Sequence, residues 1–190
     1  MKKIILFLFL AIVFNTGFKT TGKGSKTLNF VDKAKYVADT IENPYYLLNY
    51  PFEVYKNSFI EKLDSRLGKG KITIADSETK VVDYTLTLTK ISFTESIDPQ
   101  TVNDTTSEDS GKIFPTQLCS MKVETALYNS KGELIDNITC ITNDHEVLAN
   151  NKKNHGTYLI KTLPDNIFIR LAKICATSTM DELLKKISKN

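Results

Sequence analysis

Apolar and polar residues alternate without interruption along the stretch VVDYTLTLTKISF, from Val81 to Phe93. One face collects Val82, Tyr84, Leu86 and Leu88, while the other collects Asp83, Thr85, Thr87 and Thr89. A period of two is typical of a strand that is buried on one side, so this stretch predicts the central strand of a sheet. Near Lys90 the apolar parity shifts to Ile91 and Phe93, which predicts a β-bulge.

Two other stretches have the spacing of amphipathic helices. The first follows Pro51 and ends at Gly68, which suits a left-handed C-cap; its apolar positions are Phe52, Tyr55, Phe59 and Leu63. The second follows Pro164, with Asp165 as a possible cap, and its apolar positions are Ile167, Leu171, Ile174, Met180, Leu183 and Ile187. Because Ser and Thr are indifferent helix formers, the segment 177–179 predicts a kink or a split in this second helix.

The segment 30–41 fits two structures. Phe30, Ala34, Val37 and Ile41 recur at helical spacing, yet AKYVADT is also compatible with a first strand. The stretch from Lys71 to Ala75 predicts a short strand. Periodicity alone leaves the choice for 30–41 open.

A β-hairpin is predicted from Leu118 to Asn143, with the strands CSMKVETALY and ELIDNITCIT joined by a turn that contains Gly132. Pairing Tyr128 with Glu133 sets the register. In that register Leu127 faces Leu134, Val123 faces Ile138 and Met121 faces Cys140.

The hairpin register makes Cys119 and Cys140 diagonal neighbours, which makes this pair the candidate disulfide. A bridge needs Cβ atoms about 3.5 to 4.5 Å apart, so a small register change or a bulge would be required. Cys175 is the competing partner. No cysteine has the spacing of a metal ligand, and neither His145 nor His155 is close to a cysteine in sequence, so we expect no metal and no cofactor.

The segment 95–112, ESIDPQTVNDTTSEDSGK, is acidic, rich in Ser and Thr, and almost without large apolar residues. Its composition predicts a long exposed loop. A binding loop or a calcium site is the functional alternative, because carboxylate oxygens are calcium ligands, but the spacing does not match an EF-hand.

The N-terminus has a basic start at Lys2 and Lys3 and then eleven apolar residues from Ile4 to Phe14. This pattern predicts a secretory signal peptide over residues 1–22, with cleavage between Asn15 and Gly22. A retained membrane anchor is the rival interpretation, but a membrane span needs about 20 apolar residues. We therefore expect an exported, periplasmic or secreted protein with no membrane span after signal cleavage.

Removing residues 1–22 changes the charge balance. The whole chain has 25 basic and 22 acidic residues, and three of the basic ones precede Gly22 with no acidic residue, so 25 − 3 = 22 basic residues remain against 22 acidic ones. A net charge of zero provides no long-range field that would attract nucleic acid, which we do not expect as a partner.

The order of elements predicts one α+β domain over residues 23–190. We expect a mostly antiparallel sheet of four or five strands, with two or three amphipathic helices packed on one face.

The run from FEVYKNSFIEKLDSRLGKG through VVDYTLTLTKISF to KVETALYNSKGELIDN and a C-terminal helix resembles small bacterial cell-envelope proteins. These proteins have the fold of the TolB N-terminal domain and of the lipoprotein activator of penicillin-binding proteins. The resemblance covers residues 35–190 in element order, and Asp83, Tyr84 and Gly132 are the residues that match. It implies a strand at residues 35–40, and it carries over no functional residue. The chain departs from lipoproteins in having no Cys directly after its apolar run.

Two functions of different class follow. The first is a noncatalytic envelope accessory protein that binds a protein partner. The second is a carrier that holds an apolar molecule or lipid between sheet and helices, lined by Phe30, Tyr45, Tyr46, Tyr50, Phe52, Tyr55 and Phe59. Aromatic residues at helical spacing are more often plain core, which favours the first. The sequence has no G-x-S-x-G, H-E-x-x-H or P-loop motif, so we do not expect an enzyme.

Overall fold

The computed structural model describes residues 26–41, 47, 50–67, 72–75, 81–101, 103, 105, 106, 108, 110–147 and 166–189. Five strands and two helices lie in these ranges: β1 (Lys26–Ile41), α1 (Phe52–Leu67), β2 (Ile72–Ile74), β3 (Tyr84–Thr101), β4 (Ile113–Asn129), β5 (Leu134–Val147) and α2 (Ile167–Lys189). The predicted signal peptide over 1–22, Gly68 and Asp165 lie outside the described residues. No helix in the described ranges is long and apolar enough to cross a membrane.

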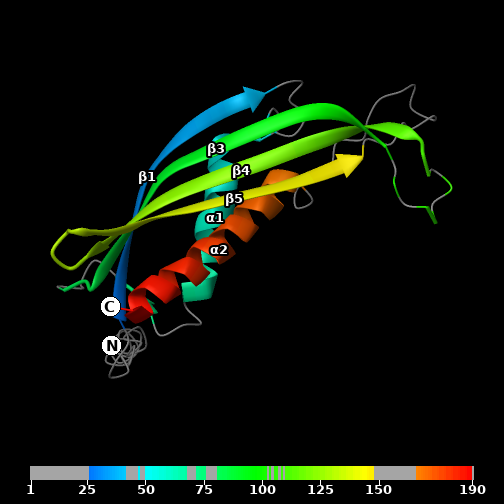
Figure 1. The fold of residues 1–190 in the computed structure, drawn as a ribbon. Helices are drawn as coiled ribbons and strands as arrows, with labels where there is room; N and C mark the ends of the chain where they lie inside the picture. Colours follow the sequence, from blue (N-terminus) through cyan, green and yellow to red (C-terminus); the bar gives the residue numbers. More distant parts are fainter. Residues whose placement is uncertain are drawn as a thin grey trace, which may run out of the picture.

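The strands form one sheet in the order β2-β1-β3-β4-β5 (Figure 1). Strand β1 runs parallel to β2 and β3, whereas β3, β4 and β5 are antiparallel to one another. The segment 30–41 is therefore a strand, as the resemblance implied. Parallel strands need a crossover connection, and α1 lies in the one that follows β1.

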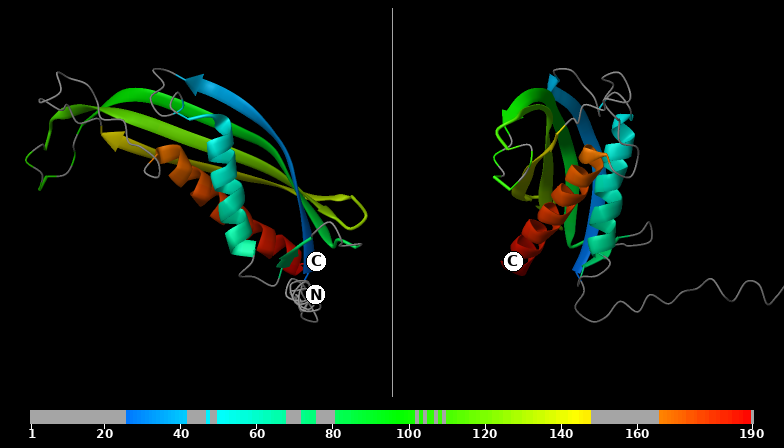
Figure 2. Two further views of the ribbon diagram at one scale, coloured as in Figure 1. Left: turned by 180° about the vertical axis from the view of Figure 1, so that it is seen from behind. Right: turned by 90° about the vertical axis from the view of Figure 1, so that its right-hand side faces the viewer.

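Both helices cover the same, concave face of the curved sheet (Figure 2). The core lies between the sheet and the two helices. It is formed by every second residue of the strands and by the helix faces turned toward the sheet; its largest fully buried side chains are Tyr55, Phe59, Phe93, Phe168, Leu28, Leu63, Leu67, Leu86, Leu88, Ile91 and Met121. The register shift between Leu88 and Lys90 is the predicted bulge. It moves Ile91 and Phe93 onto the helix side, which confirms the predicted change of parity. The predicted α+β class is confirmed.

The hairpin has the predicted strands but a different register. Tyr128 pairs with Leu134, and after an irregularity Leu127 pairs with Asp136, so from there on each partner lies two residues later than predicted. The pairing starts one residue late and the bulge adds another, which together preserve the side-chain face because the period of a strand is two. The predicted pairing partners were therefore wrong. The predicted inward face was right for Val123, Leu127, Ile138 and Cys140, which are buried, but wrong for Leu134, which is 52% exposed.

The exposed loop expected over 95–112 begins later than predicted. β3 continues to Thr101 and pairs with β4 as far as Thr101 opposite Ile113, so the segment 95–101 is strand. The outer ends of β3 and β4 project past the helices (Figure 1), and residues 98–101 are exposed, so this part of the strand has little apolar surface to bury and needs few apolar residues. The compositional rule misread a polar strand as a loop.

α2 is one continuous helix, and the split expected at 177–179 does not occur. Thr177 is accommodated because its hydroxyl donates a hydrogen bond of 3.0 Å to the carbonyl oxygen of Lys173, one turn earlier. At the start of the helix the side-chain oxygen of Asn166 accepts a 2.8 Å hydrogen bond from the backbone N–H of Phe168. Asn166 is therefore the N-cap.

Candidate binding surface

The face of the sheet opposite the helices, here called the open face, carries mostly polar side chains on β3, β4 and β5. These come from the strand positions that alternate with the core: Lys90, Thr94 and Ser96 of β3, Ser120, Lys122 and Glu124 of β4, and Asn137, Thr139, Ile141, Asn143 and His145 of β5. Lys122 and Glu124 form an ion pair with each other, and Lys90 lies opposite Glu124 in the register. On these three strands the charged groups are therefore gathered at the middle of the open face, and its other side chains are mainly neutral.

Strand β5 is the exposed side of this surface. It pairs with β4 and with no other strand in the described ranges, so its outer backbone N–H and C=O groups face away from the sheet. Its five outward side chains are all exposed, and the most apolar of them, Ile141, is 68% exposed. An exposed edge strand with an exposed apolar residue is a typical site for protein contact.

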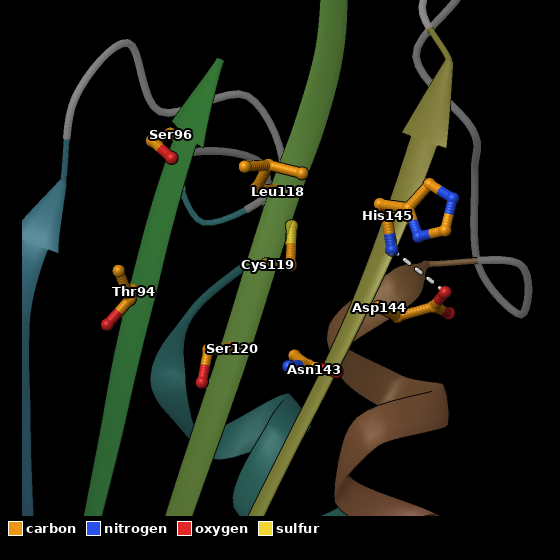
Figure 3. Close-up of a pocket in the computed structure, with 8 residues that line it drawn as sticks. All are labelled: Thr94, Ser96, Leu118, Cys119, Ser120, Asn143, Asp144 and His145. Carbon is orange, nitrogen blue, oxygen red and sulfur yellow. Dashed lines mark hydrogen bonds between the residues drawn. The ribbon is translucent and has the colours of Figure 1, made fainter. Parts of the chain in front are cut away.

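A pocket of about 400 Å³ opens across β3, β4 and β5 (Figure 3). It is lined by Thr94, Ser96, Leu118, Cys119, Ser120, Asn143, Asp144 and His145. Three hydroxyls, an amide and an imidazole share this space with one leucine. The pocket is therefore suited to a polar, uncharged group that both donates and accepts hydrogen bonds.

One hydrogen bond is drawn among the residues that line the pocket. In Figure 3 the backbone N–H of His145 donates to the Asp144 carboxylate at 2.8 Å. The figure draws no hydrogen bond between the His145 ring and Ser96 or Ser120, which is the contact by which a base activates a serine hydroxyl. Within the described ranges no three His, Cys, Asp or Glu residues are grouped as metal ligands.

Asp144 is turned away from the open face and toward α2. Its carboxylate accepts a 2.9 Å hydrogen bond from the Arg170 guanidinium. Burial raises the pKa of Asp144, but the hydrogen bonds from Arg170 and from the His145 backbone outweigh burial, so the net pKa lies below its usual value. This ion pair ties the exposed edge strand to the helix layer.

A second carboxylate, Glu95, is fully buried on the helix side of β3. Its two oxygens accept hydrogen bonds from the Gln117 side chain at 2.7 Å and from the backbone N–H of Leu47 at 3.1 Å. A buried carboxylate needs such partners, because leaving it unpaired would cost several kcal/mol, on the order of 3 to 5. Glu95 therefore anchors the chain that precedes α1 to the sheet, a structural role.

The structure separates the two cysteines of the candidate disulfide. Cys119 pairs across the strands with Asp144, whereas Cys140 pairs with Val123. Asp144 and Cys140 are four residues apart on β5, about 13 Å at 3.3 Å per residue, which is beyond disulfide reach. All three cysteines are free and buried, and Cys140 instead lies beside Cys175 of α2. The two-residue difference in register is what moved Cys119 away from Cys140.

Of the aromatic residues expected to line a carrier cavity, Tyr55 and Phe59 belong to the core, whereas Phe30 lines an apolar groove. Tyr55 and Phe59 are 0% exposed, and the Tyr55 ring packs 5.5 Å from Phe93 and 5.7 Å from Phe168, centroid to centroid. Tyr45 and Tyr46 lie outside the described residues. A separate apolar groove of about 350 Å³ lies between α1 and strands β1 and β2, lined by Phe30, Ile60, Glu61, Leu63, Asp64, Leu67 and Ile74.

Sequence reasoning missed the polar pocket across β3, β4 and β5, because its residues come from three strands. Thr94, Ser120 and Asn143 are neighbours only in the observed register, and each occurs in an ordinary polar context along the chain. The outward parity of these positions was the one available signal.

Comparison with known proteins gives structural matches only. No family model matches the chain, and no curated protein sequence matches it. The chain is similar to rare lipoprotein B from Shewanella oneidensis, with 12% identity, a TM-score of 0.45, and coverage of 86% of this chain and 98% of that one. It is also similar to a minor lipoprotein from Acinetobacter baumannii, with 12% identity, a TM-score of 0.44, and coverage of 87% and 94%.

A third similar structure is a neuraminyllactose-binding hemagglutinin homolog from Helicobacter pylori, with 15% identity, a TM-score of 0.49, and coverage of 87% of each chain. We transfer no residue and no activity from these three proteins. The resemblance to the TolB N-terminal domain and to the activator of penicillin-binding proteins stays a prediction.

Proposed function

We propose that this chain is a noncatalytic, exported cell-envelope accessory protein that binds a protein partner through its open face. The observation that carries the proposal is the strand β5, whose outer edge is unpaired within the described ranges and whose five outward side chains are exposed around Ile141. Both helices occupy the opposite face (Figure 2), so among the described residues no element covers the open face.

The chemistry of the open face suits a polypeptide. An added strand would satisfy the outer backbone groups of β5, while Ile141 would supply an apolar anchor in a polar setting. The adjacent pocket, with Ser96, Ser120 and Asn143, would take a polar uncharged side chain or a peptide group. Nucleic acid is a poor candidate, because the chain after residue 22 has as many acidic as basic residues.

Export is the part of the proposal that rests on residues 1–22. Fractionation of cells that make the chain from its own start codon, followed by mass measurement of the intact protein, tests it. We expect the protein in the envelope or the medium, shortened at its N-terminus within 15–22. A full-length chain in the cytoplasm would overturn the export.

Partner binding is tested with a photo-crosslinking amino acid placed at Ile141. Ile174 of α2 provides the matched control, because it is also an exposed isoleucine, 50% exposed against 68% for Ile141, but lies on the helix layer. We expect a discrete, protein-sized crosslink in cells from position 141 and none from position 174. Equal yields from both positions, or no crosslink from either, would overturn the open face as the binding surface.

A carrier of an apolar molecule is the second candidate, and the groove between α1, β1 and β2 favours it. Its volume of about 350 Å³ falls within the usual range of small-molecule sites, and its lining is mainly apolar. Titration with a fluorescent apolar probe, in the wild type and in Ile60→Glu, tests this function. Saturable binding that the substitution abolishes would support a carrier, and binding that is unaffected by it would exclude this groove.

A further inference from the structure

The structure brings two buried cysteines from different layers into contact. Cys140 lies on the helix side of β5 and Cys175 lies on α2, 35 positions later in the sequence. Cys140 is 6% exposed and Cys175 is 0% exposed. The Cys175 sulfur is 4.0 Å from the backbone carbonyl oxygen of Cys140 and 4.0 Å from that of Met121, so it points at the strand residue that carries the other thiol.

The two thiols also interact directly with each other. A hydrogen bond between them lowers the pKa of Cys140 to about 7, with Ser178 contributing, and raises the pKa of Cys175. This shared hydrogen bond places the two sulfurs side by side in the folded protein, which is the arrangement that a disulfide between them requires.

Cys119 is placed differently. It lies between Glu95 and Asp144 in the sheet, and burial, together with the nearby Glu95 carboxylate, raises the pKa of its thiol. Such a buried, protonated thiol is inert. The three cysteines thus divide into one adjacent pair and one remote, unreactive thiol.

We infer that Cys140 and Cys175 form a disulfide that fastens α2 to the edge strand β5. The bond rests on the proposed export, because an oxidising compartment is where such bonds persist. One of the two thiols, as its thiolate, attacks a disulfide of the oxidant, a thiol–disulfide oxidoreductase or oxidised glutathione, and releases one of its thiols. The other thiol of the chain then loses its proton and displaces the second thiol, so one S–S bond forms in the chain and one is reduced in the oxidant.

The bond has a structural consequence for the open face. Because both sulfurs are buried, the exchange occurs before α2 closes over β5, and the finished bond then holds the two together. The Asp144–Arg170 ion pair joins the same two elements at 2.9 Å, and Lys186 pairs with Asp136 nearer the other end of β5. The disulfide would be the covalent member of this set, and it would fix the strand that carries Ile141.

The test uses the purified full chain, unfolded in denaturant and refolded in a glutathione buffer poised near −200 mV, roughly that of an oxidising compartment. The protein is then denatured, alkylated without reductant, and counted for labelled thiols by mass. We expect one labelled thiol in the wild type, none in Cys119→Ser, and two each in Cys140→Ser and Cys175→Ser. Three labelled thiols in the wild type, or protection of Cys119 instead, would overturn the bond.

A stability measurement on Cys119→Ser complements the thiol count. A bridge across a loop of this length raises Tm by about 10 °C in a domain of this size, so reductant should lower Tm by that amount. In Cys140→Ser the same reductant should leave Tm unchanged. An equal response in both variants would overturn the inference. Since the buffer sets the redox state, these results do not depend on export, and a failure of export leaves them unaltered.

Discussion

Replacing Phe93 with Ala should remove the contact that holds both helices against the sheet. Phe93 lies on β3, is 0% exposed, and its ring packs 5.2 Å from Phe168 of α2 and 5.5 Å from Tyr55 of α1, centroid to centroid. The rings of Phe52 and Tyr36 lie at 6.3 and 5.6 Å. One side chain thus connects three elements that are far apart in sequence.

The expected cost follows from burial and ring packing. Truncating a buried Phe to Ala costs about 3 to 5 kcal/mol, because transfer energy is lost and a cavity remains. Aromatic pairs contribute about 0.5 to 1.5 kcal/mol each beyond burial, so the upper half of the 3 to 5 kcal/mol range applies to Phe93, which packs against four other rings. The loss is a large share of the free energy of unfolding of a typical domain, about 5 to 15 kcal/mol.

Urea unfolding followed by far-UV circular dichroism measures this loss, since the chain has no Trp for fluorescence. Two controls accompany it. Phe93→Leu keeps most of the volume and should cost less than about 2 kcal/mol, and Tyr36→Ala removes a ring that is already 47% exposed and should cost about 1 kcal/mol. If Phe93→Ala costs no more than Tyr36→Ala, the packing of both helices on Phe93 is refuted.

Three further substitutions test other parts of the structure. Glu95→Gln should lower the free energy of unfolding by about 1 to 3 kcal/mol, because it puts an amide N–H₂ against the Gln117 donor. A double-mutant cycle with Gln117→Ala should show that the two side chains are coupled; additive losses of stability would contradict this. Asp144→Asn should cost under about 1 kcal/mol at pH 7, because the pair with Arg170 is partly exposed. The pKa of Asp144 is lowered in the folded state, so its stabilisation is present above the unfolded pKa of about 3.9 and is lost as pH falls through the folded value; the difference from wild type in urea unfolding should therefore shrink steadily as the pH falls below about 4, and a difference that stays constant would contradict this. Gly132→Ala should cost about 1 kcal/mol in the same assay, because φ is +79° although a Cβ would meet nothing within 4 Å; an unchanged midpoint would refute the strain.

The elements with a strong internal pattern could be predicted from the sequence. The alternation around Leu86 and Leu88 gave the central strand, and the change of parity at Ile91 gave the bulge, because a one-sided strand records its burial in every second residue. The helix from Phe52 to Leu67 was likewise predicted within a residue at each end. These features depend on local periodicity alone.

Features that depend on pairing between strands could not be predicted in the same way. The pairing begins one residue later than predicted and the bulge between Leu134 and Asp136 adds one more, so beyond Asp136 the inward face is unchanged while every partner moves by two. That two-residue shift decided which residues form the pocket and which cysteines meet. The strand character of 95–101 was also hidden, because strand ends that project past the helices need no apolar face.

Native mass spectrometry of the chain recovered from its own cell envelope tests the central proposal most directly. If the protein acts through protein contact, the spectrum should contain the chain alone, shortened at its N-terminus, or the chain with a protein-sized addition that Ile141→Lys removes and Ile174→Lys does not. A small-molecule addition that is lost on denaturation and is absent from Ile60→Glu would contradict the account, because the apolar groove and not the open face would then carry the function.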